Sequence, residues 1–172
     1  MYRELLIGCG SNRDKKIGIE GQTAWRNLIT LDMNEFHNPD VVWDCEKLPL
    51  PFDDNFFNEI HAYDVLEHTG KQGDWKFFFS QFSDLWRICK PNGLVMIIVP
   101  SVKSVWAWGD PSHTRILPAE NFIFLSQKEY EKQVGFTPMS DFRFFYKADF
   151  EIMSVFTDND STRIVLKAVK GG

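Results

Sequence analysis

The chain has 172 residues, of which 44% are hydrophobic and 25% are charged, an ordinary composition for a soluble globular protein. This length predicts one domain with a sizeable core, and no apolar run approaches the roughly 20 residues of a membrane span. Charge is uneven, because residues 1–86 carry 8 basic and 15 acidic side chains whereas residues 87–172 carry 11 and 9. The acidic first half suits a positively charged ligand and argues against a general nucleic-acid binder, although the same charges could simply be solvated surface.

The start of the chain and its cysteines bear on location and metal content. No basic and apolar leader begins the sequence, so we expect a cytoplasmic protein that does not insert into a membrane. Cys9, Cys45 and Cys89 lie far apart and have no CxxC spacing, which argues against a disulfide framework and against a zinc site. We expect free and mostly buried thiols.

Apolar runs alternate with amphipathic segments along the whole chain. Helices are predicted at about residues 75–89 and 120–134, and strands at residues 4–7, 28–32, 41–44, 57–63, 94–100, 150–157 and 163–169. This alternation predicts a single-domain α/β fold with a doubly wound, mostly parallel sheet of about seven strands. The last two strands are separated only by Asp158-Asn159-Asp160-Ser161 and are therefore predicted to form an antiparallel hairpin.

The clearest helical segment lies at residues 75–89. Phe78, Phe82 and Leu85 follow one another at steps of three and four residues, which is typical of one apolar helix face. The sequence Lys90-Pro91-Asn92-Gly93 then ends the helix, because proline cannot continue it and Asn-Gly favours a reversal. The nearly unbroken apolar run at residues 94–99 is typical of a central strand covered on both faces.

The first 32 residues carry the strongest functional signal. The apolar run Leu5-Leu6-Ile7 leads directly into Gly8-Cys9-Gly10-Ser11-Asn12, and a lone acid, Asp32, follows the second apolar run about twenty residues later. Glycines at the end of a first strand let the backbone approach a ligand closely, and a carboxylate at the end of a second strand can bind a ribose. This layout predicts a nucleotide pocket.

Five segments in order resemble the class I S-adenosylmethionine-dependent methyltransferases, specifically the small enzymes of the methyltransferase type 11 group. They are LLIGCGSN, ITLDMN, DVVWDCEKLPLPFDDNFFNEIHAYDVLEHT, LWRICKPNGLVMIIVPS and DPSHTRILPAENF, which together run from Leu5 to about Phe124. The glycine segment alone is weak evidence, but the ordered set is specific. The short antiparallel final hairpin also fits this group and separates it from the all-parallel dinucleotide-binding dehydrogenases.

The resemblance implies S-adenosyl-L-methionine as cofactor and assigns roles to particular residues. Gly8, Cys9 and Gly10 would lie against its methionine part, Asp32 would bind the ribose hydroxyls, and Met33 would pack on the adenine. Asp44 would accept from the adenine amino group, with Cys45 beside it, while Ala62 and Tyr63 would line the pocket near the transferable methyl. Each residue also has a purely structural reading: a tight turn for the glycines, a helix N-cap for Asp32, a turn carboxylate for Asp44 and plain packing for Tyr63.

Two departures from the group's pattern bear on the site. Ser11-Asn12 replaces the usual third glycine, so the helix expected behind the loop would begin differently, although asparagine tolerates a positive φ. The chain also begins almost directly at the first strand, without the N-terminal helices that often cover the site in larger relatives. We therefore expect a site that is either open to a large substrate or closed by a partner subunit, such as a second copy in a homodimer.

Methyl transfer needs alignment of the acceptor and, for some acceptors, removal of a proton. His68 and His113 are the candidate bases, because histidine titrates near neutrality. Residues 101–147 are predicted to form a substrate-facing insertion between the fifth and sixth strands, where Trp106, Trp108, Asp110 and Arg115 accompany His113. In the structural alternative, His68 orients the loop after the fourth strand, and Asp110, His113 and Arg115 only tie their own loop down.

Other readings of these residues are weaker. His61, Asp64 and His68 alternate faces along a strand end, so we expect no metal site from them. Trp75 and the run at residues 77–79 are expected to be core or interface. No Pro-Pro-Tyr/Phe signature of amino-methylating DNA methyltransferases is present, which disfavours DNA as acceptor.

Three functions follow from different classes. The leading hypothesis is a methyltransferase acting on an O or N nucleophile of a small molecule, sugar or nucleotide-type acceptor. The second is a catalytically weak or inactive accessory subunit that keeps the cofactor fold and uses exposed tryptophans as partner contacts. A nicotinamide-linked oxidoreductase is disfavoured by the final hairpin and by the LPLPF and VLEH segments.

Overall fold

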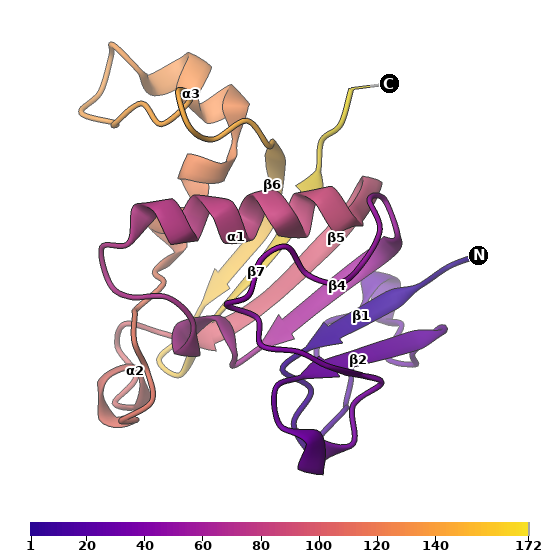
Figure 1. Cartoon of the computed structure of the whole chain (residues 1–172). Helices are drawn as coiled ribbons and strands as arrows, with labels where there is room; N and C mark the ends of the chain where they lie inside the picture. Colours follow the sequence, from indigo (N-terminus) through magenta and orange to yellow (C-terminus); the bar gives the residue numbers. More distant parts are fainter. Residues whose placement is uncertain (172) are drawn as a thin grey trace.

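The protein forms one mixed β-sheet with helices packed against it, in a computed structural model that describes residues 1–171 (Figure 1). The sheet has seven strands in the order β3-β2-β1-β4-β5-β7-β6. The strands are β1 Glu4–Ile7, β2 Leu28–Asp32, β3 Val41–Val42, β4 Phe57–Tyr63, β5 Cys89–Pro100, β6 Phe150–Thr157 and β7 Ser161–Ala168. The α-helices are α1 Trp75–Ile88, α2 Trp106–Gly109 and α3 Gln127–Gln133, and the 3-10 helices are η1 Ile19–Gly21, η2 Glu35–His37, η3 Leu66–His68 and η4 Ala119–Leu125.

Strand direction divides the sheet into two parts. β3, β2, β1, β4 and β5 pair in parallel, whereas β7 pairs antiparallel with both β5 and β6. The expected α/β fold and its final antiparallel hairpin are therefore confirmed. Parallel strands bring their carboxyl ends to the same edge, so the segments after β1, β2, β4 and β5 emerge together at what we call the carboxyl edge.

The core lies between the sheet and α1. The side chain of Asp74 caps this helix by accepting a hydrogen bond from Phe77 N at 3.0 Å. The predicted stripe of Phe78, Phe82 and Leu85 is buried against sheet residues. η4 and α3 bury Phe122, Leu125 and Tyr130 in the same cluster, so these helices cover the same face of the sheet (Figure 1).

The opposite face is covered by the irregular segment between β1 and β2, whose regular structure is limited to the single 3-10 turn η1 among the described residues. A full helix does not form behind the glycine loop, since Asn12, Gly18 and Gly21 all disfavour one. Polar contacts replace helix packing here. Lys15 Nζ lies 2.6 Å from Glu4 Oε1 and 2.8 Å from Glu59 Oε2, and all three residues are buried.

The same buried network continues along β4. His61 Nε2 lies 2.9 Å from Glu59 Oε2, and His61 Nδ1 lies 2.5 Å from the Tyr63 hydroxyl. Burial lowers the pKa of His61, so the neutral ring donates from Nε2 to Glu59 and accepts from Tyr63 at Nδ1. This network explains why charged and aromatic residues alternate with apolar ones along β4.

Several boundaries differ from the prediction, among them those of β7, which spans Ser161–Ala168 rather than residues 163–169. β3 ends at Val42, because Asp44 instead accepts a hydrogen bond from Glu46 N within a turn. The helix expected at residues 120–134 is divided into η4 and α3 by Ser126, whose side chain caps α3. β5 begins at Cys89, directly after α1, rather than at Leu94.

Two other expectations concern membranes and thiols. Among residues 1–171, no helix combines the length and the apolar character that crossing a membrane would require.

Cys9, Cys45 and Cys89 are free thiols, as expected. Cys9 and Cys89 are buried, and Cys45 is half-buried.

Candidate functional site

The glycine loop follows β1 at the carboxyl edge. Gly8 and Gly10 both have positive φ values, 61° and 52°, which other residues adopt only with strain. A Cβ on Gly8 would lie 2.4 Å from Val65 Cγ2, whereas a Cβ on Gly10 would meet no atom within 4 Å. Gly8 therefore packs against the loop after β4, and Gly10 faces open space.

Asp32, at the end of β2, is bound to this loop. Its Oδ2 accepts a hydrogen bond from Gly10 N at 2.9 Å, and its Oδ1 accepts one from Asn34 N at 2.8 Å. Burial opposes ionisation of the carboxyl, but the two backbone donors and nearby His37 outweigh it and hold the pKa of Asp32 below its usual value. The Asp32 side chain is 10% exposed, so a small part of it remains accessible to solvent.

Two residues that the sequence did not point to complete this corner. His37 Nδ1 lies 3.2 Å from Asp32 Oδ2, close enough for an ion pair but not aligned as a hydrogen bond. Arg13 donates to the backbone oxygens of His37 and Asn38 at 2.9 and 2.7 Å. The position of His37, five residues after Asp32, was the sequence feature that could have indicated it as a neighbour of the carboxylate. No sequence feature indicated Arg13.

The predicted adenine contacts lie on neighbouring loops. Met33 is 71% exposed directly after Asp32. Asp44 Oδ1 accepts a hydrogen bond from Glu46 N at 2.9 Å, which is the contact of a turn carboxylate. Its Oδ2 has no hydrogen bond with any of residues 1–171. Cys45 is half-buried, and burial raises the pKa of its thiol to about 12, so the thiol stays protonated.

Ala62 and Tyr63, predicted to lie near the transferable methyl, are both buried at the end of β4. Ala62 belongs to the core on the α1 side of the sheet. Tyr63 points to the opposite face, where its hydroxyl accepts a hydrogen bond from Ile17 N at 3.1 Å. Only the backbone of these residues therefore reaches the carboxyl edge.

The residues present provide the features that an adenosyl-containing cofactor needs. Open space adjoins the backbone of Gly10, and Asp32 lies one hydrogen bond away from that loop. A carboxylate has about four acceptor sites, so Asp32 can accept from hydroxyls in addition to its two backbone donors. Met33 offers an exposed apolar surface beside it.

A second group of polar side chains lies farther along the carboxyl edge, after β4 and β5. His68 and His113, the two predicted bases, are brought together, with ring centroids 4.5 Å apart in an edge-to-face arrangement. Ser112 Oγ hydrogen-bonds with His68 Nδ1 at 3.0 Å and donates to Asp110 Oδ1 at 2.5 Å. His61, considered with His68 as a metal ligand, instead belongs to the buried network on the other face.

Glu67 is the member of this group that the sequence analysis missed. Its Oε1 lies 4.0 Å from His113 Nε2, and the residue is 2% exposed. Burial raises the pKa of Glu67 to about 8. Its position directly before His68, just beyond a strand end, was the available signal.

The loop carrying His113 is held against η3 by backbone contacts. Thr114 N and Arg115 N donate to Glu67 O at 2.9 and 3.3 Å. Arg115 is 5% exposed and donates from Nε to Leu66 O at 3.0 Å and from a terminal nitrogen to Thr69 Oγ1 at 2.9 Å. Arg115 thus does what the structural alternative expected, which leaves its role toward a substrate a prediction.

The two predicted substrate tryptophans lie on α2, beside this loop. Trp106 and Trp108 are 66% and 72% exposed, and Trp108 Nε1 donates to Val102 O at 3.3 Å. Ala107 between them is buried and lines a narrow crevice together with Glu67, His113 and the end of β5. Of the three consecutive residues on α2, only Ala107 lines the crevice, and the two tryptophans are directed to solvent.

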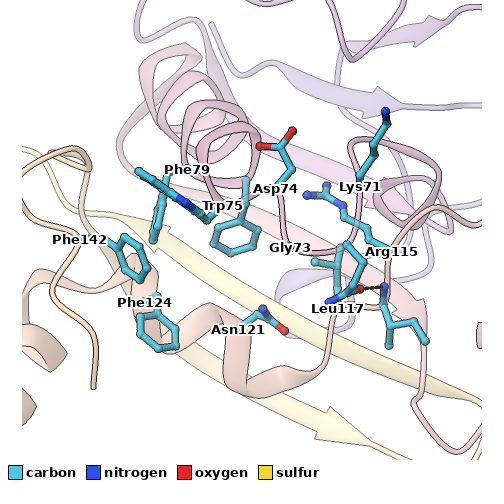
Figure 2. A pocket seen from close by; sticks show the side chains of 13 residues that line it. Lys71, Gly73, Asp74, Trp75, Phe79, Arg115, Leu117, Asn121, Phe124 and Phe142 are labelled. Atoms are coloured by element: carbon cyan, nitrogen blue, oxygen red, sulfur yellow. Dashed lines mark hydrogen bonds between the residues drawn. The ribbon is translucent and has the colours of Figure 1, made fainter. Parts of the chain in front are cut away.

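A cavity of about 200 Å³ adjoins this crevice, and both share Arg115, Ile116 and Leu117 as lining residues. In Figure 2, Trp75, Phe79, Phe124 and Phe142 form its aromatic part, while Arg115 extends toward the loop with Lys71 and Gly73. Ile116 N donates to Gln72 Oε1 at 2.8 Å across its rim. Trp75 and Phe79, expected to be core, therefore also wall a cavity.

Comparison with known proteins places this geometry in context. A SAM-dependent methyltransferase from Archaeoglobus fulgidus superposes with a TM-score of 0.59 at 18% identity, covering 96% of this chain and 86% of that one. The chain has the class I methyltransferase fold. No protein-family profile matches the sequence, and no curated protein does.

Other proteins with this methyltransferase fold differ in their activities and partners. A complex between the Haloferax volcanii methyltransferase activator Trm112 and a protein assigned as a methyltransferase gives a TM-score of 0.59 at 13% identity, covering 99% of this chain and 83% of that one. The [4+2]-cyclase SpnF gives 0.59 at 13% identity, covering 99% and 76%. At such identities the likeness establishes the fold alone, so the activity has to be argued from the site.

Proposed function

We propose that this protein is an S-adenosylmethionine-dependent methyltransferase that acts on an O or N nucleophile of a small molecule, sugar or nucleotide-type acceptor. The observation that carries the proposal is the hydrogen bond between Asp32 and Gly10 N, which joins an acid at the end of β2 to an open glycine loop at the end of β1. The methyltransferase fold of the sheet supports the same assignment.

The chain's own residues divide into a cofactor side and an acceptor side. On the cofactor side, Gly8, Cys9 and Gly10 bind the methionine part, and Asp32 binds the ribose. Met33, Asp44 and Cys45 surround the adenine. The ends of β1 and β4 lie between the cofactor side and the acceptor side. The bound cofactor supplies an activated methyl group, so the protein needs chiefly to orient the acceptor and receive its proton.

The acceptor side is built around the histidine pair. His68 and His113 stand at the carboxyl edge, where an acceptor hydroxyl or amine would give up its proton. The aromatic cavity beside Arg115 is suited to an apolar part of the acceptor, and Trp106 and Trp108 lie exposed on α2. We include residues 101–147, which link β5 to β6, as the substrate-facing segment of a single domain.

Calorimetry with the cofactor and with S-adenosylhomocysteine tests the proposal. The unaltered protein is expected to bind with a micromolar-range dissociation constant. Asp32→Asn keeps the shape but removes the charge, and is expected to weaken binding at least tenfold. Asp158→Asn is the matched control, because Asp158 also accepts two backbone hydrogen bonds, from Asp160 N and Ser161 N, in the β6–β7 turn. Absence of binding by the unaltered protein would remove the proposal.

A second candidate is a non-catalytic subunit that keeps the fold, with Trp106 and Trp108 as partner contacts. The exposed tryptophans are the observation that favours this candidate, and the Haloferax volcanii complex gives an example of a neighbour of this fold bound to a protein partner. His113→Ala separates the two functions. An enzyme loses turnover by about 10²–10⁴-fold while its cofactor affinity stays within twofold, since His113 lies on the acceptor side. A parent protein that methylates no acceptor in a broad panel favours the subunit.

A further inference from the structure

Glu67 and His113 contain buried polar atoms that no group among residues 1–171 satisfies. Both carboxylate oxygens of Glu67 and Nδ1 of His113 are enclosed and have no hydrogen-bond partner, although Glu67 is 2% exposed. Buried polar atoms in folded proteins almost always have partners, so an orphaned carboxylate points to a missing proton donor or cation. Arg115, whose positive charge acts on Glu67, directs its donors to Leu66 O, Thr69 Oγ1 and Gln81 instead.

Two histidines lie near enough to Glu67 to share a cation with it after a small inward movement. Glu67, His68 and His113 each offer one atom, and these atoms all lie within 4.8 Å of one another. Glu67 and His68 are fixed by η3, while the contacts of Thr114 N and Arg115 N with Glu67 O fix the loop that carries His113. The three ligands thus come from two segments that are already bound together.

A comparison within the molecule shows what this trio lacks. Glu4, Glu59 and His61 form a second set of three potential ligand atoms within the same limit. There, Lys15 Nζ lies 2.6 and 2.8 Å from the two carboxylates and serves as the cation. Within the described part of the chain, no ammonium group lies in the trio at the carboxyl edge, so its position for a positive charge is open.

We propose that Glu67, His68 and His113 bind a divalent transition-metal cation, for which Zn²⁺ is the best match. Two imidazoles and one carboxylate form a known catalytic zinc set that keeps its fourth position open, and ferrous iron also accepts this set. Ligand bonds of about 2.0–2.1 Å place tetrahedral ligand atoms about 3.3 Å apart, so the trio draws inward on binding. His68 is exposed and free to make that adjustment.

The surroundings suit a site that acts on an acceptor. Ser112 Oγ links His68 Nδ1 to Asp110 Oδ1, so Asp110 can orient the His68 imidazole from outside the trio. This inference rests on the proposed function for its purpose. An acceptor whose oxygen or nitrogen occupies the fourth position would lose its proton more readily, which restricts the acceptors to hydroxyl or amine compounds able to coordinate zinc.

Zinc binding is measured directly on protein freed of metal with a chelator, by titration with Zn²⁺ alone against a chromophoric competitor. We expect one Zn²⁺ per chain with micromolar or tighter affinity, and a Co²⁺ derivative with the absorption bands of a tetrahedral site. Glu67→Gln and His113→Ala are each expected to lower the Zn²⁺ affinity at least tenfold. His37→Ala is the histidine control, because His37 lies beside Asp32 and outside the trio.

Other outcomes separate this site from the proposed function. If the buried variants fail to fold by circular dichroism, His68→Ala replaces them, because His68 is exposed. The site is overturned if the parent, the folded trio variants and His37→Ala all bind zinc with equal affinity. It is also overturned if the parent binds no zinc. If the parent binds zinc but not the cofactor, the proposed zinc site stands and the proposed methyltransferase function falls. If the parent binds the cofactor but not zinc, the proposed function stands and the zinc site falls.

Discussion

Gly8 and Gly10 share a left-handed backbone conformation but have different surroundings. Gly8 lies against Val65, whereas the space beside Gly10 is open. The sequence pattern predicted one role for both glycines, because a glycine motif does not reveal which atoms lie opposite each residue. The same limit applies to Asp32, whose position at the end of β2 was predicted but whose neighbour His37 was not.

Alanine substitutions at the two glycines are therefore expected to have different effects. Gly10→Ala costs about 1–2 kcal/mol of unfolding free energy through its positive φ, and its methyl group enters the proposed cofactor space. Gly8→Ala adds a clash with Val65, which raises the cost by a further 1–3 kcal/mol or so. Urea unfolding measures the unfolding free energies of the two variants. Calorimetry measures their cofactor affinity, which Gly10→Ala is expected to lower. Equal stability of the two variants would contradict this packing.

The histidine pair illustrates how far residue types alone could lead. His68 and His113 were predicted as acceptor-side residues, and the structure places their rings in contact. Glu67 was overlooked because a glutamate after a strand is ordinarily solvated. Its burial arises from the Thr114–Arg115 contacts with η3, which connect segments 47 or more residues apart and leave no trace in local sequence.

At the scale of elements, periodicity predicted β1, β2, β4 and β6 with their observed bounds, and it placed α1 to within one residue. Long apolar runs and a capped, amphipathic helix carry enough local information for this. The segment between β1 and β2 was less predictable, because its irregular backbone is stabilised by long-range ion pairs with Glu4 and Glu59 rather than by its own periodicity.

The stripe on α1 is expected to supply much of the stability on the helix-covered face. Phe82 is fully buried and packs against Phe78 and Phe122, so Phe82→Ala should lower the unfolding free energy by about 3–5 kcal/mol. Phe136→Ala, at a side chain that is 84% exposed, should change it by less than about 0.5 kcal/mol. Chemical denaturation distinguishes these values, and similar losses for both variants would place the core elsewhere.

Over the whole molecule, the two faces of the sheet are stabilised in different ways. One face is apolar and helix-covered, while the other contains the buried group of Glu4, Lys15, Glu59, His61 and Tyr63. Burial opposes ionisation of Glu59, but hydrogen bonds from His61, Lys15 and Tyr2 prevail and lower its pKa. A lowered carboxyl pKa means that this stabilisation is complete above the ordinary value near 4.5 and is lost as pH falls further.

Lys15→Met tests this charged face. At pH 7 the variant leaves two buried carboxylates without their ammonium group, and we expect a loss of about 3–5 kcal/mol. The difference from the parent should shrink as pH falls below about 4.5, because the stabilisation that ionised Glu59 gives the parent is lost there. Lys132→Met removes an exposed ion pair with Glu129 and should cost at most about 1 kcal/mol. A pH-independent difference between Lys15→Met and the parent would show that the network contributes nothing through charge.

The central claim is that the carboxyl edge beside Gly10 and Asp32 receives an adenosyl group, and a crystal structure with S-adenosylhomocysteine tests it most directly. The account predicts ribose hydroxyls on the Asp32 carboxylate and the amino-acid part along Gly8, Cys9 and Gly10. Ligand density in the aromatic cavity beside Trp75, or an Asp32 that still contacts only Gly10, Asn34 and His37, would contradict it.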